Sequence, residues 1–172
     1  SISIGPEGSG VRVLCRRILN LYGINESNTT FVNLSIADST VALEDKQIDA
    51  AFFLLSAKTP VIKRLNSRIG LQLIGIEEAE ALSHTISHLE RVIIPKGAFE
   101  IRSLRPGKDV ETVALPVTMI VGKEAGDALS ALVANILREN YAWETLFTKD
   151  YELPSFVYHE LEPHPAAKDL YE

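Results

Sequence analysis

The residues best suited to chemistry form a glycine-rich segment near the N-terminus. Residues 5–10 read Gly-Pro-Glu-Gly-Ser-Gly and connect a predicted strand at residues 1–4 to a predicted helix capped by Ser9. Glycines leave the backbone amides uncovered, and the first amides of a helix point outward at the positive end of its dipole. The segment therefore predicts a site for a carboxylate or a phosphate, with the Ser9 hydroxyl as a further donor. It is also compatible with a tight strand-to-helix turn that binds nothing.

A second candidate loop follows the apolar run at residues 48–55. Residues 56–60 read Ser-Ala-Lys-Thr-Pro, in which Thr59 and Pro60 have the types expected for the N-cap and the first position of a helix. Ligands of parallel α/β sheets bind at the carboxyl ends of the strands, where both loops are expected. The predicted ligand-binding residues are Gly8, Ser9, Gly10, Val11, Ser56, Lys58, Thr59 and Pro60.

No arrangement typical of an enzyme accompanies these loops. The last glycine is not followed by Lys-Ser or Lys-Thr, as a Walker loop requires, and the segment is not a nucleophile elbow. Gly-Pro-Glu-Gly also occurs in knotted RNA methyltransferases, but the rest of the sequence does not resemble them. The acidic residues near strand ends show no preferred pairing; they are Asp49, Glu77, Glu78 and Glu80. We therefore predict no enzymatic activity and no cofactor.

Histidines, arginines and the single cysteine have simpler structural interpretations. His84 and His88 are four residues apart, but a metal site requires a third convergent ligand, so we expect surface histidines and no metal. The arginines that follow the glycine segment are expected on a solvated helix face, although they could pair with an anion; they are Arg12, Arg16 and Arg17. Cys15 lies among apolar residues and is expected in the core.

Length and charge narrow the class of protein. The chain has 172 residues, enough for one domain or for one lobe of a two-lobed protein. Its formal net charge of −6 argues against binding to nucleic acid or to a membrane surface, because both require a basic face. No apolar run approaches the ~18–20 residues that span a bilayer. The chain begins inside a predicted strand, from which we expect a fragment of a longer protein.

The elements that position these loops alternate between strand and helix over residues 1–95. Strands are predicted at residues 1–4, 30–34, 48–55 and 71–76, and helices at 9–23, 38–46, 59–69 and 77–83. The helix at 38–46 is expected to be capped by Asp38 or Ser39, and the helix that starts at Pro60 to bury Ile69. This alternation predicts an α/β fold, a mainly parallel sheet with flanking helices.

The pattern changes in the later part. A strand at residues 91–94 and a longer one at 111–121 are predicted, with Pro116 marking an edge or a bulge. An amphipathic helix follows around residues 129–137, and another around 143–147 precedes an irregular tail.

Three short stretches resemble the TAXI family of solute-binding proteins, which serve TRAP transporters. Residues 5–14 resemble its G-P-x-G-S-G-T-x-x-L stretch, followed in both by Leu-Tyr-Gly, here at 21–23. Residues 48–53, Ile-Asp-Ala-Ala-Phe-Phe, are similar to its I-D-A-x-F-F strand. Residues 164–172 are similar to its closing H-P-G-A-x-x-Y-x-E. The stretches occur in the family's order.

The resemblance implies a two-lobed, venus-flytrap fold of the periplasmic-binding-protein type II kind. Residues 1–95 would be the second ligand-binding lobe, and 96–172 a crossover strand, helix and C-terminal segment returning toward a first lobe that is absent here. It also implies a small anionic solute such as an amino acid or dicarboxylate, membrane permease subunits as partners, and a periplasmic or extracytoplasmic location. The surface that the first lobe would cover is expected to favour self-association. Residues 94–115 and 152–155 resemble a branch with membrane-anchoring helices, which implies a membrane-anchored parent.

Departures from the family pattern leave the solute open. Val11 replaces a threonine, residues 56–60 replace a glycine-containing turn, and Ala166 replaces a glycine. The first two fall where ligand contacts are expected. The alternative function is a ligand-sensing regulatory module of the same fold with no transport role, which the absence of a neighbouring permease gene would favour.

Overall fold

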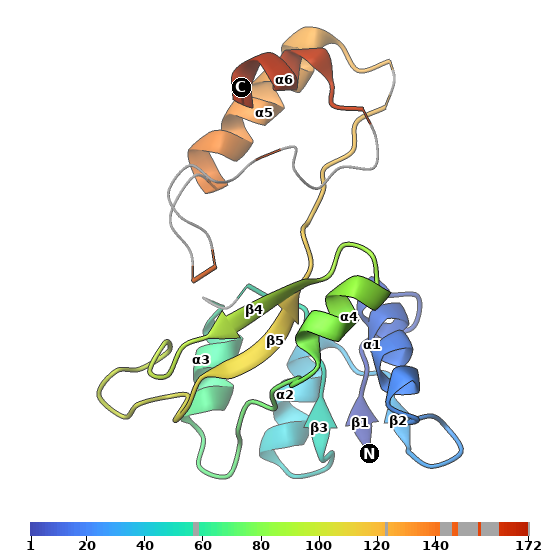
Figure 1. Cartoon of the computed structure of the whole chain (residues 1–172), viewed down its shortest axis with the longest axis vertical. Helices are drawn as coiled ribbons and strands as arrows, with labels where there is room; N and C mark the ends of the chain where they lie inside the picture. The colour runs from blue at the N-terminus through green and yellow to red at the C-terminus, as the bar shows by residue number, and fades with distance from the viewer. Residues whose placement is uncertain (57–58, 123, 142–145, 148–154, 156–161, 172) are drawn as a thin grey trace. The chain divides into compact units, whose positions relative to one another are not determined.

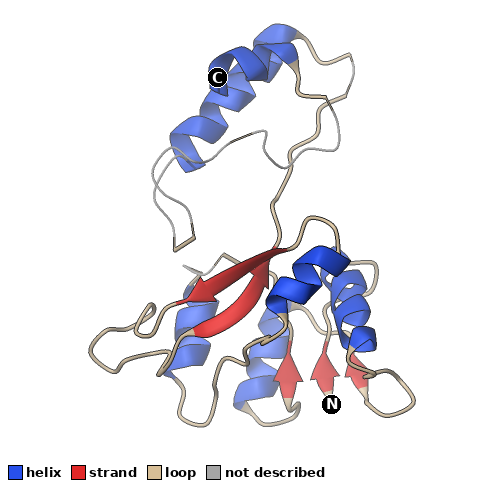
Figure 2. Cartoon of the chain, viewed as in Figure 1, coloured by secondary structure: helices blue, strands red, loops and turns tan. Residues whose placement is uncertain are grey.

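The computed structural model describes residues 1–56, 59–122, 124–141, 146–147, 155 and 162–171 (Figures 1 and 2). The chain forms two compact units. One comprises Ser1–Leu73 with Phe99–Pro106, and the other comprises Ile74–Ala98 with Gly107–Glu172. The predicted division into a lobe at residues 1–95 and a return segment at 96–172 refers to a longer, two-lobed protein and stays a prediction.

The first unit is built on a parallel sheet with strand order β2-β1-β3. β1 (Ile2–Ser3) lies in the middle, beside β2 (Phe31–Val32) and β3 (Ala50–Ala51). Each strand is followed by a helix: α1 (Gly10–Leu21), α2 (Ile36–Glu44) and α3 (Pro60–Ser67). This order confirms the predicted α/β class with a parallel sheet and flanking helices (Figure 1).

The two faces of this sheet are covered by different helices. Ile4 is fully buried and clusters with Cys15 and Leu19 of α1, which confirms the predicted core position of the cysteine. Successive strand residues point to opposite faces, so the neighbouring Ser3 points away from α1. The Ser3 hydroxyl lies 2.8 Å from the hydroxyl of Ser39 on α2, and both side chains are buried. α1 and α2 therefore pack on opposite faces.

In its described residues, the second unit contains an antiparallel pair of strands and three helices. β4 (Glu90–Ile94) pairs with β5 (Val110–Ala114), and α4 (Ala79–Thr85) contacts both strands. α5 (Asp127–Tyr141) packs against α6 (Pro165–Tyr171). The sequence predicted an irregular tail in place of α6, while the helix predicted at 143–147 lies mostly outside the described residues. Within the described ranges, no helix combines the length and the apolar character required to cross a membrane.

Several predicted boundaries are wrong for identifiable reasons. Ser35 caps α2 in place of Asp38 or Ser39, because its hydroxyl accepts the Asp38 amide at 3.1 Å. β5 ends at Ala114, two residues before Pro116, since proline has no amide for a ladder.

The apolar segment at residues 71–76 was predicted as a buried strand, but the structure has no strand there, and Ile74 is 72% exposed. The Ile76 amide donates to the Glu111 carbonyl of β5 at 2.8 Å, but one such bond does not make a ladder. Ile69 is 97% exposed because α3 ends two residues earlier, at Ser67. Of the strand predicted at residues 48–55, only Ala50–Ala51 forms a strand, β3.

Candidate functional site

The predicted loops meet at one edge of the first sheet because its strands are parallel. The segments after β1, β2 and β3 all leave at the carboxyl edge, and β1 is the central strand. The glycine-rich loop therefore lies between the loop at residues 33–35 and the segment at residues 52–56. The loop at residues 33–35 was not among the predicted site segments, although Ser35 followed three residues later by Asp38 is a local signal for the start of a helix.

Two glycines in the first loop adopt a backbone that other residues avoid. Gly5 has φ of 88° and Gly8 has φ of 75°. A Cβ atom on Gly5 would approach the Ser9 hydroxyl to 3.2 Å and the Val11 side chain to 3.3 Å. A Cβ atom on Gly10 would have no described atom within 4 Å. Gly5 therefore shapes the turn, whereas Gly10 faces open space at the start of α1.

Ser9 is the N-cap of α1, as predicted. Its hydroxyl accepts the Arg12 amide at 3.3 Å and donates to the Pro6 carbonyl at 2.7 Å. The hydroxyl proton is thus engaged within the loop. An anion at this point would depend on backbone amides and not on the Ser9 side chain.

The Gly10 and Val11 amides are the donors at the start of α1. Among the described residues they have no hydrogen-bond partner, as expected for the first amides of a helix. They lie at the positive end of the α1 dipole, which favours an anion. Arg12 forms an ion pair with Glu7 at 2.9 Å, so its charge is already balanced within the loop.

The arginine face of α1 is only partly solvated. Arg17 is exposed, in agreement with the prediction. The Arg12 side chain is only 21% exposed, and Arg16 forms an ion pair with Glu26. Arg12 and Arg16 are therefore held in ion pairs with acidic residues of the same unit.

The third loop supplies a second helix start at the same edge. The Thr59 amide donates to the Ser56 carbonyl at 3.0 Å, which turns the chain into α3. Thr59 is the N-cap and Pro60 the first helical residue, as predicted, but the Thr59 side chain makes no capping hydrogen bond. Lys58 lies outside the described residues, so its role at the rim stays a prediction.

The chemistry of the remaining candidates is limited. Burial raises the pKa of the Cys15 thiol to about 12, so this thiol is protonated at neutral pH and is a poor nucleophile. His84 contacts Glu80 at 3.3 Å, while His88 lies beyond the end of α4. The described residues contain no group of three His, Cys, Asp or Glu side chains arranged to hold a metal ion.

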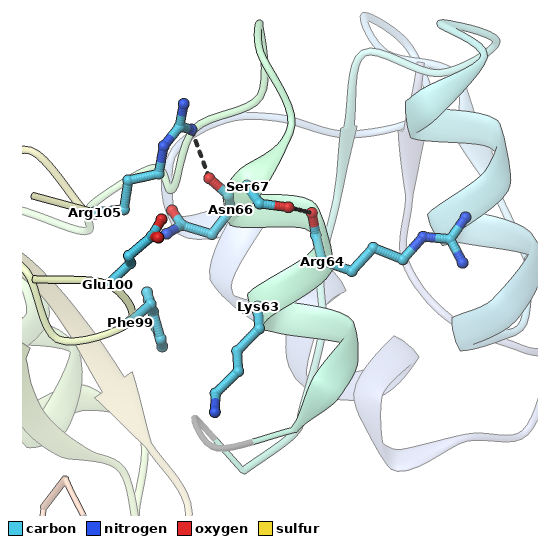
Figure 3. A pocket seen from close by; sticks show the side chains of 7 residues that line it. All are labelled: Lys63, Arg64, Asn66, Ser67, Phe99, Glu100 and Arg105. Atoms are coloured by element: carbon cyan, nitrogen blue, oxygen red, sulfur yellow. Dashed lines mark hydrogen bonds between the residues drawn. The ribbon is translucent and has the colours of Figure 1, made fainter. Parts of the chain in front are cut away.

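A pocket of about 380 Å³ lies elsewhere in the first unit (Figure 3). None of the predicted ligand-binding residues lines it. Its lining residues belong to α3 and to the segment before Pro106; they are Lys63, Arg64, Asn66, Ser67, Phe99, Glu100 and Arg105.

Most of the sequence matches a known family of binding proteins. Residues 1–156 match the NMT1-like family, a periplasmic-binding-protein-like family related to solute-binding proteins. The match includes the glycine-rich loop, the parallel sheet and the pocket, and it supports a solute-binding role in general. The chain belongs to the NMT1-like family.

Proposed function

We propose that the chain is part of the extracytoplasmic, periplasmic solute receptor of a TRAP-type transporter and that it binds a small carboxylate. The observation that carries the proposal is the pair of amides at Gly10 and Val11, which have no hydrogen-bond partner among the described residues and lie beside open space at Gly10. The solute is an amino acid or a dicarboxylate, and its other end faces the rim at residues 56–60.

The site attracts an anion through local dipoles, not through the net charge of −6. A carboxylate has two oxygens. One can accept a hydrogen bond from the Gly10 amide and the other from the Val11 amide. Hydrogen bonds to a charged acceptor contribute about 1.5–3 kcal/mol each when they are shielded from water. This edge is open in the first unit, so we expect weak binding by the chain and tighter binding when a second lobe closes over the solute.

NMR titration of the ¹⁵N-labelled chain tests the proposal with glutamate, 2-oxoglutarate and a phosphorylated sugar as probes. A carboxylate should shift the Gly10 and Val11 amide signals and raise the melting temperature. The stabilisation should reach about 2.7 kcal/mol at a hundredfold excess of ligand over Kd.

Gly10→Val is the informative variant, because the new side chain enters space that no described atom occupies and covers the amides. Asn20→Val places the same side chain on an exposed position of the last turn of α1 and is the matched control. The proposal predicts that Gly10→Val abolishes the shifts and that Asn20→Val retains them. If Gly10→Val binds the carboxylate as well as the wild type does, the site does not lie at this loop. The transport role further requires a permease gene beside that of the parent protein.

A further inference from the structure

The glycine-rich loop carries an acidic side chain of its own. The Ser9 amide and hydroxyl both donate to the Pro6 carbonyl, at 3.2 Å and 2.7 Å, which closes a turn around Glu7 and Gly8. Gly8 has φ of 75°, as the third residue of a type II turn requires. Glu7 is the second residue of this turn, and its side chain is 85% exposed.

Arg12 directs its side chain toward the same loop. It is the third residue of α1, and the side chains of a helix lean toward its N-terminus. From this position a side chain can reach back to the N-cap residue, as the acid of a capping box does. The Arg12 Nη1 atom donates to a carboxylate oxygen of Glu7, which lies two residues before the N-cap, at 2.9 Å. The ion pair therefore spans the segment that contains the Gly10 and Val11 amides.

An arginine at this end of a helix is unfavourable unless an anion accompanies it. The N-terminus of a helix already carries a partial positive charge, and the first turn of α1 contains no acidic residue. Glu7 supplies the missing negative charge from the preceding loop. The carboxylate of a solute bound at the start of α1 would supply the same charge, so Glu7 and the solute compete for Arg12.

Glu7 holds this position weakly. Its side chain is exposed, and exposed ion pairs contribute little to stability because water and salt screen them. The pair also leaves part of the guanidinium unused, since the Arg12 Nε atom is buried and has no hydrogen-bond partner among the described residues. An arginine binds a carboxylate best through two parallel hydrogen bonds. Release of Glu7 frees the Arg12 side chain to turn and to use its Nε atom in this way.

We propose that Glu7 is an internal competitor of the solute: it occupies Arg12 in the free loop, and the carboxylate of the bound solute replaces it. This inference rests on the proposed function and adds a specificity-determining residue to the same site. Arg12 selects an anion over a neutral solute. Glu7 lowers the affinity for that anion without contacting it.

The side-chain Nε–H signal of Arg12 reports the replacement directly. In the ¹⁵N-labelled 172-residue chain, 2-oxoglutarate should shift this signal together with the Gly10 and Val11 amide signals. The dimethyl ester of 2-oxoglutarate has the same carbon skeleton without the two charges, and it should shift none of the three.

Four variants separate competition from simple repulsion. Arg12→Gln should weaken 2-oxoglutarate about tenfold, because a hydrogen bond between charged groups is lost. Glu7→Gln should strengthen it about two- to fivefold, the range expected when an exposed ion pair no longer has to break. The variant that carries both changes should lose this gain, because no guanidinium is left to compete for. The matched control Glu26→Gln removes the partner of Arg16, on the same helix, and should keep wild-type affinity.

Two results would overturn the proposal. One is a gain from Glu7→Gln that persists in the Arg12→Gln background, because Glu7 would then act through repulsion alone. The other is a shift of the Gly10 and Val11 amides without a shift at the Arg12 Nε–H; the proposed function would then stand and the competition would be wrong. The exposed Glu7 can be replaced without affecting the fold, so the wild-type and Glu7→Gln titrations decide even if Arg12→Gln unfolds.

The same signals distinguish the failure of the proposed function. If 2-oxoglutarate shifts the Arg12 Nε–H but neither amide, the arginine binds the carboxylate and the amide site is wrong. If it shifts none of the three signals, both the site and the competition are wrong.

Discussion

Three glycines in the loop after β1 have different physical roles. Gly5 and Gly8 have positive φ, whereas Gly10 is the first residue of α1. Only Gly5 combines a positive φ with close neighbours, at 3.2–3.3 Å from an added Cβ. A sequence shows three identical letters here. It cannot show which of them is required by the backbone and which leaves room for a ligand.

Gly5→Ala should destabilise the chain by about 1–2 kcal/mol for the left-handed backbone alone, with a further cost from the contacts to Ser9 and Val11. Gly10→Ala should leave stability unchanged or raise it by up to about 1 kcal/mol, because alanine is the better helix former. Urea unfolding followed by circular dichroism measures both. Equal destabilisation by the two variants would contradict the separation of roles.

The helices α2 and α3 are joined by a cluster of charges around Glu44. Its carboxylate accepts the Arg64 Nε at 2.8 Å and the Arg68 Nε at 3.0 Å, and its side chain is 11% exposed. The hydrogen bonds from Arg64 and then from Arg68 lower the pKa of Glu44 to about 2, from an ordinary value of 4.5.

This pKa shift predicts a pH dependence of stability. A carboxyl with a lowered pKa in the folded state stabilises the fold above its unfolded pKa of 4.5, and this contribution is lost as the pH falls through that value toward about 2. Glu44→Gln should therefore lower the urea midpoint at pH 7, and the difference from wild type should shrink by pH 3. Glu77→Gln, at an exposed residue outside the cluster, is the control. A difference that stays constant with pH would show that the cluster does not act through charge.

The order of helices and strands could be predicted from the periodicity of the apolar residues. The residues at which each element begins and ends could not. α1 was predictable because Ser9, the apolar spacing and Gly23 are all local signals. Strand length depends on partners elsewhere in the chain, so the apolar runs at residues 48–55 and 71–76 could not reveal where pairing ends. The candidate loops were predictable in the same local way. The pocket was not, because Lys63 and Glu100 come from distant segments that Arg105 connects.

At the scale of the whole molecule, the two units share a chain that passes between them more than once. Phe99–Pro106 belongs to the first unit, while β4 before it and β5 after it belong to the second. Within the first unit, this segment contributes the Arg105 bonds to the end of α3. Phe99–Pro106 therefore belongs to the first unit, although the chain enters it after β4 and leaves it toward β5, and both of these strands belong to the second unit.

Replacing Phe99–Pro106 with a glycine-serine linker should therefore affect the first unit selectively. The amides in the second half of α3 should exchange about tenfold faster, because the Asn66 and Arg68 carbonyls lose their charged donor and the helix end frays. The β4 and β5 amides should keep their protection, since their pairing from Glu90 to Ile94 involves none of the replaced residues. Hydrogen exchange with mass spectrometry measures both regions at once, and Arg102→Ala, an exposed arginine of the same segment, should change neither. Equal loss of protection in α3 and in the β4–β5 pair would mean that the two units open together, and that the replaced segment couples them instead of serving one.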